Sequence, residues 1–306
     1  MHSLFTLLTI DIPIDPEITK IGGLLLTWHG VFTAVGIAAA VYLAVVLGKK
    51  KGFLEDDIYT VALLAIPCGI VGARALFVVE NWGRTNSGLN SVWDALRINE
   101  GGIAIYGALV GGIAGGAVYC FFRKLPMRRG ADVAGCAALL GMAIGRIGDL
   151  INGEHFSRVS SLPWAIRYTN SNSPSYLGHP QCGIDPNLRQ FASDLCAQHP
   201  AVVYEMIGDL LILGICLFIM FRIRRDGVAF FTFLFLYSAM RFGVTALRLD
   251  SRVIIWGLRT PQVTALFLMP SALIGLIYSW RKSRSDKPVR PPPEVAPARP
   301  SRATAR

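Results

Sequence analysis

Apolar segments long enough to cross a lipid bilayer follow one another along most of the chain. A membrane-spanning helix needs about 20 mainly apolar residues. Seven stretches approach or meet this length: 23–47, 58–80, 102–122, 132–151, 201–221, 228–246 and 262–280. The pattern predicts an all-α polytopic membrane protein with about seven transmembrane helices, contained in one domain over residues 1–282.

The positive charges between these segments indicate the topology. They fall on one side of the membrane if the N-terminus is outside and the C-terminus is cytoplasmic. We then expect residues 152–199 to form a small extracytoplasmic cap and the Pro-rich basic residues 283–306 to be a disordered cytoplasmic tail. The clusters are Lys49–Lys51, Arg123 with Lys124, Arg128 with Arg129, Arg222 with Arg224 and Arg225, and Arg281 with Lys282 and Arg284.

Composition narrows the class of protein further. The chain is 53% hydrophobic and 16% charged, which is too apolar for an ordinary soluble domain. Its net charge of +10 is distributed as membrane topology requires, so we expect no nucleic-acid partner.

The run Leu4–Ile12 lacks a basic start and contains Asp11, so we interpret it as a short leader at the membrane surface. Cys182 and Cys196 share one loop, with or without a disulfide. The histidines have no metal-ligand spacing, so we expect no metal site.

Several charged side chains lie inside the predicted spans. Insertion scales put the cost of such a charge at about 2.5–3.5 kcal/mol. Each arginine therefore pairs with an acid or backbone carbonyls, or it holds an anionic ligand. For Arg74 and Arg248 pairing is the simpler interpretation. For Arg146 and Arg241 we predict an anionic headgroup, because the acids in the spans are few and a guanidinium suits phosphate.

Polar groups near the same ends of the spans are candidates for chemistry. His29 and Tyr106 each precede a glycine in an apolar segment, and histidine is the usual general base near neutral pH. Asn152 and Glu154 follow Arg146 at the end of the fourth span. Further candidates are Tyr204 and Glu205, one turn into the fifth span.

The order of motifs resembles that of a known family. Gly145-Arg146-x-Gly148-x-x-x-Asn152-Gly153-Glu154 is similar to the signature of the prolipoprotein diacylglyceryl transferases of bacterial plasma membranes. The resemblance covers about residues 20–282. It includes Trp28-x-Gly30, Gly72-x-Arg74, Gly101-Gly102, His199-Pro200 with Tyr204-Glu205, Arg241 with Arg248, and Pro261-Gln262.

The resemblance implies a multi-pass enzyme of the bacterial inner membrane that acts without a cofactor. Such enzymes move diacylglycerol from phosphatidylglycerol to the lipobox cysteine of a prolipoprotein signal peptide. A thioether forms and glycerol phosphate is released. The resemblance assigns Arg146 and Arg241 to the phosphate. It places Asn152, Glu154, Arg74, Tyr204 and Glu205 around the headgroup.

The departures from the family pattern leave alternatives open. The family's histidine of the third span is Tyr106 here, and its tyrosine of the first span is His29. We predict that the two face one another and that His29 is the base. Asp149 replaces an asparagine, so it either neutralises Arg146, orders it, or replaces the acid missing at Thr245. The alternatives are a non-catalytic or transport relative that binds an anionic lipid headgroup, and a transferase of altered substrate.

Overall fold

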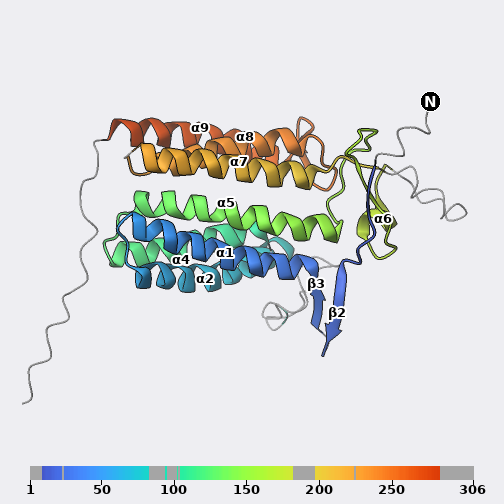
Figure 1. Ribbon diagram of the computed structural model, residues 1–306, viewed down its shortest axis with the longest axis horizontal. Helices are drawn as coiled ribbons and strands as arrows, with labels where there is room; N and C mark the ends of the chain where they lie inside the picture. Colours follow the sequence, from blue (N-terminus) through green and yellow to red (C-terminus); the bar gives the residue numbers. More distant parts are fainter. Residues whose placement is uncertain are drawn as a thin grey trace, which may run out of the picture.

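Seven long apolar helices run side by side through the computed structural model, which describes residues 9–22, 24–82, 94, 102, 104–181, 197–223 and 225–282 (Figure 1). Each is long and apolar enough to cross a membrane, which confirms the predicted fold class. They are α1 (Trp28–Lys50), α2 (Glu55–Asn81), α4 (Ile105–Phe122), α5 (Met127–Asn152), α7 (Ala201–Arg222), α8 (Val228–Thr245) and α9 (Thr260–Arg281).

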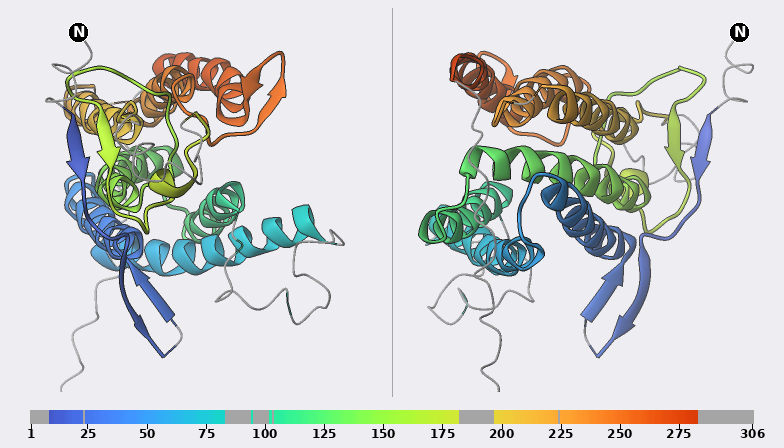
Figure 2. Two further views of the ribbon diagram at one scale, coloured as in Figure 1. Left: turned by 90° about the vertical axis from the view of Figure 1, so that its right-hand side faces the viewer. Right: turned by 60° about the vertical axis from the view of Figure 1, so that its left-hand side comes forward.

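Helix α5 lies at the centre of the bundle. It packs against α1 on one side and against α7 and α8 on the other, while α9 packs on α8 and α4 on α2 (Figures 1 and 2). Its buried Cys136 and Leu139 belong to a core that includes Ile212 and Cys216 of α7. Side chains from α1, α7 and α8 can therefore meet on the two faces of α5.

Glycine allows α2 and α4 to touch at the backbone. A Cβ atom at Gly107 would lie 2.2 Å from the carbonyl oxygen of Gly72, and one at Gly111 would lie 2.2 Å from that of Cys68. Small residues at this spacing permit close helix packing in membranes. The glycines of α4 therefore serve helix packing.

Short strands and one short helix gather at one end of the bundle, which we call the cap end. Strand β1 (Ile10–Ile12) pairs in parallel with β4 (Ile166–Tyr168), and α6 (Pro174–Gly178) lies beside them. The leader prediction needs correction here, because residues 10–12 are a strand of the cap. Residues 1–8 lie outside the described part of the chain.

Two hairpins complete the cap end. Strands β2 (Glu17–Ile21) and β3 (Leu24–Thr27) lead into α1, and β5 (Val253–Ile255) pairs with β6 (Leu258–Arg259) before α9. The first span thus begins at Trp28 instead of residue 23. The Thr27 hydroxyl caps α1 by accepting from the Gly30 amide at 3.2 Å. The third span likewise begins at Ile105 instead of residue 102.

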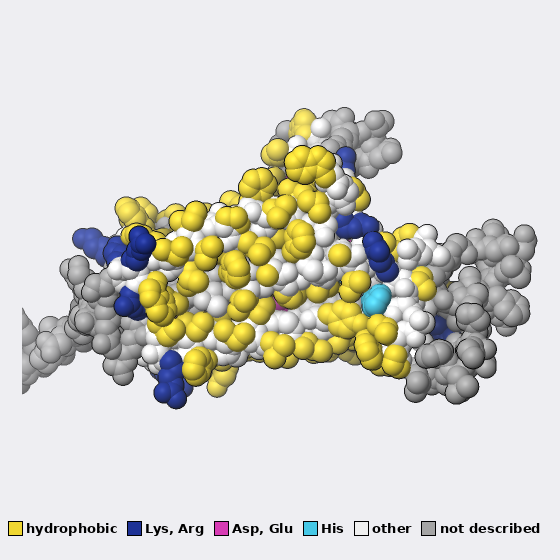
Figure 3. Space-filling view, turned by 90° about the horizontal axis from the view of Figure 1, so that it is seen from above, with side chains coloured by type: hydrophobic (Ala, Val, Ile, Leu, Met, Phe, Trp, Pro, Cys, Tyr) yellow, Lys and Arg dark blue, Asp and Glu magenta, His cyan; other side chains and the backbone are white. Residues whose placement is uncertain are grey.

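The surface of the bundle is apolar over most of its length. Figure 3 shows hydrophobic side chains spread between groups of Lys and Arg near the two ends. Lys49 and Lys50 at the end of α1, Arg222 of α7 and Arg281 of α9 lie at the end opposite the cap. The tail 283–306, Gly101, Cys182 and Cys196 fall outside the described residues.

Candidate functional site

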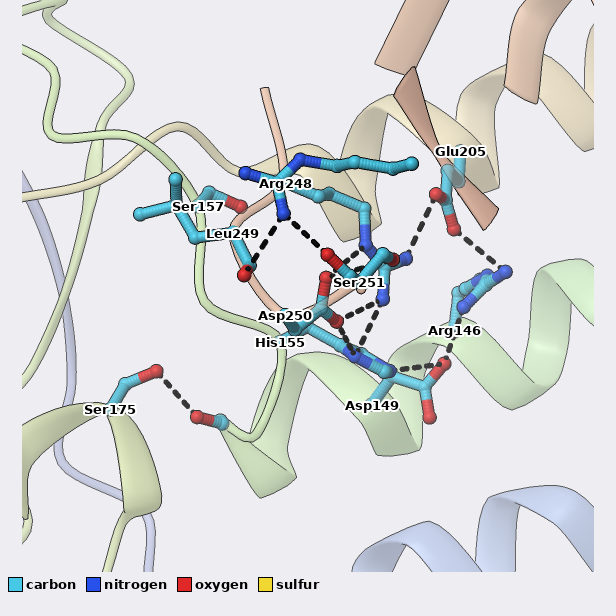
Figure 4. Close-up of polar contacts among 12 residues, drawn as sticks. Arg146, Asp149, His155, Ser157, Ser175, Glu205, Arg248, Leu249, Asp250 and Ser251 are labelled. Atoms are coloured by element: carbon cyan, nitrogen blue, oxygen red, sulfur yellow. Dashed lines mark hydrogen bonds and ion pairs between the residues drawn. The ribbon is translucent and has the colours of Figure 1, made fainter. Parts of the chain in front are cut away.

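A buried carboxylate at the cap end of the bundle gathers three arginines. Glu205 of α7 is 1% exposed and forms ion pairs with Arg146 Nη2 at 2.7 Å and Arg248 Nη1 at 2.9 Å, and with Arg241 Nη1 (Figure 4). Arg146 comes from α5, Arg241 from α8, and Arg248 from the turn after α8. Three guanidinium groups from separate segments therefore converge on one point inside the membrane domain.

Two further acids and a histidine close these contacts into a ring. Asp149 Oδ2 binds Arg146 Nη1 at 2.8 Å, and Asp250 pairs with Arg248, with Oδ1 lying 3.1 Å from Nε. His155 bridges the two acids, with Nδ1 2.9 Å from Asp250 Oδ2 and Nε2 3.5 Å from Asp149 Oδ2 (Figure 4). We call Arg146, Glu205, Arg248, Asp250, His155 and Asp149 the ion-pair ring.

Local sequence explains how the ring is assembled. Arg146 and Asp149 are three residues apart, so they lie on one face of α5. Gly153 then ends α5 in the left-handed conformation, with φ of +72°, and the chain turns to bring His155 near Asp149. A Cβ atom at Gly153 would lie 2.3 Å from Ser173 Oγ, so the turn also packs against the cap.

The ring corrects the expectation that Arg146 and Arg241 carry unpaired positive charge. Three arginines face three carboxylates, those of Asp149, Glu205 and Asp250. The pairing interpretation of Arg248 is confirmed, since its side chain is 4% exposed and bound to two acids. Each of the three guanidinium groups therefore has a carboxylate partner.

His29 joins the ring through Asp149. Its Nδ1 lies 2.7 Å from Asp149 Oδ1, and its side chain is 45% exposed at the start of α1. A Cβ atom at Gly148 would lie 2.8 Å from the Cα of His29, so α1 and α5 approach closely at this point. The ion pair of Asp149 with Arg146 fits two of the three interpretations of Asp149, that it neutralises Arg146 and that it orders Arg146. Asp149 also holds His29.

Tyr106 binds a different helix. Its hydroxyl lies 3.2 Å from Thr264 Oγ1, and Thr264 donates its own proton to the Thr260 carbonyl at 3.0 Å. Tyr106 is therefore the donor in this pair. The prediction that His29 and Tyr106 face one another is not confirmed, because the two side chains have different partners. Tyr106 does interact electrostatically with Arg241.

Comparisons with known proteins show the family of the chain. The family model for prolipoprotein diacylglyceryl transferases matches residues 16–278. The chain belongs to the prolipoprotein diacylglyceryl transferase family. Three relatives are named phosphatidylglycerol–prolipoprotein diacylglyceryl transferase. The protein of Clostridioides difficile is 29% identical over 86% of this chain and 95% of its own length. The protein of Symbiobacterium thermophilum is 32% identical over 87% of this chain and 92% of its own length. The protein of Gloeobacter violaceus is 30% identical over 89% of this chain and 96% of its own length.

Two predicted residues of the family signature lie where α5 meets the cap. Asn152 is the last residue of α5, and Glu154 follows Gly153 as an exposed side chain. Glu154 interacts electrostatically with His29. Both residues are therefore close in the chain to the ring and at the boundary between the bundle and the cap.

Arg74 and Tyr204 stand apart from the ring. Arg74 is buried, donates Nη1 to the Gly102 carbonyl at 2.9 Å and Nη2 to the Asp94 carbonyl at 2.5 Å, and lies over the Phe77 ring. It matches the interpretation of a guanidinium satisfied by backbone carbonyls. Tyr204 accepts a hydrogen bond from Trp164 Nε1 at 2.8 Å. It lies next to Glu205 in α7, at the outer edge of the site.

His155 and Asp250 belong to the ion-pair ring, and neither is among the candidates predicted from the sequence. Burial lowers the pKa of His155, but its hydrogen bonds to Asp149 and Asp250 outweigh burial and raise the pKa overall. Burial raises the pKa of Asp250, while His155 and Arg248 lower it further than burial raises it. The position of His155 inside the signature stretch was the available signal. Asp250 carried a weaker one, as a neighbour of Arg248.

Proposed function

We propose that this membrane protein transfers diacylglycerol from phosphatidylglycerol to the cysteine thiol of a prolipoprotein lipobox, forming a thioether and releasing glycerol phosphate. The observation that carries the proposal is the convergence of Arg146, Arg241 and Arg248 on buried Glu205, in a chain of this family. The curated relatives are named for phosphatidylglycerol and prolipoprotein, which supports the same two substrates.

The arginines act on the leaving group. The thiolate attacks the sp3 carbon of the glyceride, the carbon–oxygen bond breaks, and its electron pair leaves with the phosphate ester. The phosphate thereby gains a negative charge. Arg146 and Arg241 stabilise that charge once phosphate oxygens replace the carboxylate oxygens that now bind them. A well-placed donor of this kind contributes roughly 3–4 kcal/mol to transition-state stabilisation.

The thiol must lose its proton before it attacks. A free cysteine has a pKa of about 8.5, so it is mostly protonated at neutral pH. His29 is the proposed base, because its side chain is partly exposed at the cap end beside the ring. Tyr106 is less suited to the role, since its hydroxyl already donates its proton to Thr264.

The charge distribution supports a cap outside the membrane. Lys49, Lys50, Arg222 and Arg281 end their helices on the side opposite the cap. By the positive-inside rule this side is cytoplasmic, so the proposed site faces the outer leaflet. There it meets both phosphatidylglycerol and the exported prolipoprotein. The N-terminus is then outside and the C-terminus inside.

A reconstituted assay tests the proposal. The purified protein is placed in vesicles containing phosphatidylglycerol and given a peptide with a lipobox cysteine. Mass spectrometry and a glycerol phosphate assay should find one thioether for each glycerol phosphate released. A peptide with serine in place of cysteine, and vesicles of phosphatidylcholine alone, are the controls. Binding of phosphatidylglycerol without product would contradict the proposal and favour the lipid-binding or transport relative.

A further inference from the structure

Asp149 contacts both kinds of group that the proposed reaction needs. Its Oδ2 lies 2.8 Å from Arg146, on the side of the phosphate site, and its Oδ1 lies 2.7 Å from His29 Nδ1. The side chain is 10% exposed, whereas that of His29 is 45% exposed. A fixed, buried carboxylate therefore holds the inner edge of an imidazole whose outer edge is accessible.

This geometry selects one tautomer of His29. A carboxylate accepts hydrogen bonds, so Nδ1 carries the proton and the lone pair of the neutral ring is on Nε2. Nε2 has no hydrogen-bond partner among the residues that the structure describes. The Thr27 cap and the tight contact at Gly148 fix the backbone that carries the ring. His29 is thereby prepared to accept a proton at a known atom.

The other titratable groups near His29 do not compete for this role. His155 contacts the carboxylates of Asp149 and Asp250, which favour its charged form, and Arg248, whose Nη2 lies 2.7 Å from Nδ1 and opposes that form. Glu154, in the turn after α5, interacts electrostatically with His29 and is exposed to solvent. Both nitrogens of His155 already have side-chain partners, whereas Nε2 of His29 has none among the described residues, so His29 is the better placed of the two to accept a proton.

We propose that Asp149 is a positioning residue that acts through His29, holding the ring so that Nε2 takes the proton of the attacking thiol. The inference rests on the proposed function. The thiol proton moves to Nε2, the sulfur electron pair forms the carbon–sulfur bond, and the carbon–oxygen pair leaves with the phosphate ester. The imidazolium formed is stabilised by the Asp149 carboxylate and returns its proton to water after product release.

A double-mutant cycle in the vesicle assay tests the inference. Asp149→Asn should lower kcat by about 100-fold or more, within the range for loss of general base catalysis, with little change in KM for phosphatidylglycerol. In the His29→Ala background the same substitution should cost less than about threefold, because its target is already gone. Asp226→Asn, at the opposite end of the bundle, is the matched control and should keep wild-type kcat.

A second variant keeps the inference testable if Asp149→Asn does not fold. Gly148→Ala retains Asp149 and Arg146 but places a Cβ atom 2.8 Å from the His29 backbone, so it should separate His29 from Asp149 and lower kcat. For His29→Ala, the deficit relative to wild type should shrink as the pH approaches about 8.5, where the thiol ionises unaided.

The outcomes separate the two proposals. An equal loss from Asp149→Asn with and without His29, or a rise in KM alone, would show that Asp149 serves Arg146 and would overturn the inference. If the wild-type protein forms the thioether and Asp149→Asn forms it at the same rate, the inference about Asp149 is overturned and the proposed function stands. No thioether from folded wild-type protein would overturn the proposed function itself.

Discussion

Acidic side chains are paired inside the bundle at both ends of α5, but their partners differ between the two ends. At the end opposite the cap, Asp132 accepts hydrogen bonds from the backbone amides of Gly227 and Phe230, both at 2.7 Å. Beside it, Arg129 Nε lies 3.2 Å from both oxygens of Asp226. At the cap end, Glu205 is bound by the side chains of three arginines.

The difference lies in what the acid's partners can do. Backbone amides at the start of α8 cannot leave Asp132 without disturbing the helix, so that cluster is part of the architecture. Arginine side chains can change rotamer and exchange one oxyanion for another, because carboxylate and phosphate offer them similar geometry. The backbone contacts of Asp132 are therefore structural, whereas under the proposed function the arginines at the cap end are available for ligand exchange.

The largest expected effect comes from removing the centre of the cap-end cluster. Glu205→Gln leaves three arginines without their shared acid. Breaking a buried pair in this way costs about 3–5 kcal/mol of unfolding free energy. Unfolding in detergent should show the loss, and added glycerol phosphate should restore part of it by binding the freed guanidinium groups. No response to glycerol phosphate would argue against the exchange of oxyanions.

Removing one arginine should abolish most activity and leave the fold. Arg241→Gln should reduce the rate of transfer by about 10²–10³-fold, the usual cost of losing one oxyanion donor. Arg241→Lys should recover little, since an ammonium lacks the planar fork. The vesicle assay measures the rate, and size-exclusion chromatography checks the fold. Full activity in Arg241→Lys would show that charge alone suffices.

At the end opposite the cap, a substitution of Asp132 should lower stability and leave the rate of transfer unchanged. Asp132→Asn replaces one acceptor oxygen with an amide group, which leaves a buried backbone donor without its partner. The expected cost is about 1–3 kcal/mol of unfolding free energy. The rate per folded molecule should be unchanged. A loss of rate as large as that of Arg241→Gln, in protein that is fully folded, would remove the distinction between the two ends.

The smallest expected effect is a pH dependence carried by His155. The pKa of His155 is raised in the folded protein above its ordinary value of 6.5. Its stabilising contribution is then fully present below about pH 6.5 and is lost as the pH rises through the folded value. As the pH rises above 6.5, wild-type protein should lose more stability than His155→Gln. Parallel stability curves from thermal unfolding would contradict this.

The sequence predicts the spans because twenty apolar residues in a row have few alternatives. The first residue of each span is predicted less accurately than the existence of the span. Leu24, Leu25 and Leu26 are apolar and yet belong to strand β3, since Thr27 caps α1 and fixes its start at Trp28. An apolar strand at a membrane surface and the first turn of a span look alike in hydropathy. Only the capping hydrogen bond separates them.

The sequence predicts several residues of the candidate site, but not the ion pairs between them. Arg146, Arg241 and Glu205 were all candidates, and the structure brings them together. The expectation of unpaired positive charge failed because Glu205 and Asp250 lie far along the chain from Arg146. The helical spacing within α5 gives Arg146 and Asp149. No local pattern places α7 and the turn after α8 opposite them.

One measurement tests the central claim most directly, which is that the cap-end arginines hold the phosphate of the lipid. The rate of thioether formation is compared for Arg146→Gln and Arg129→Gln in the same phosphatidylglycerol vesicles, per folded molecule. Each variant removes one partly buried arginine of α5 that pairs with an acid. The account predicts a loss of about 10²–10³-fold for Arg146→Gln and the wild-type rate for Arg129→Gln. Equal rates in the two variants would contradict it.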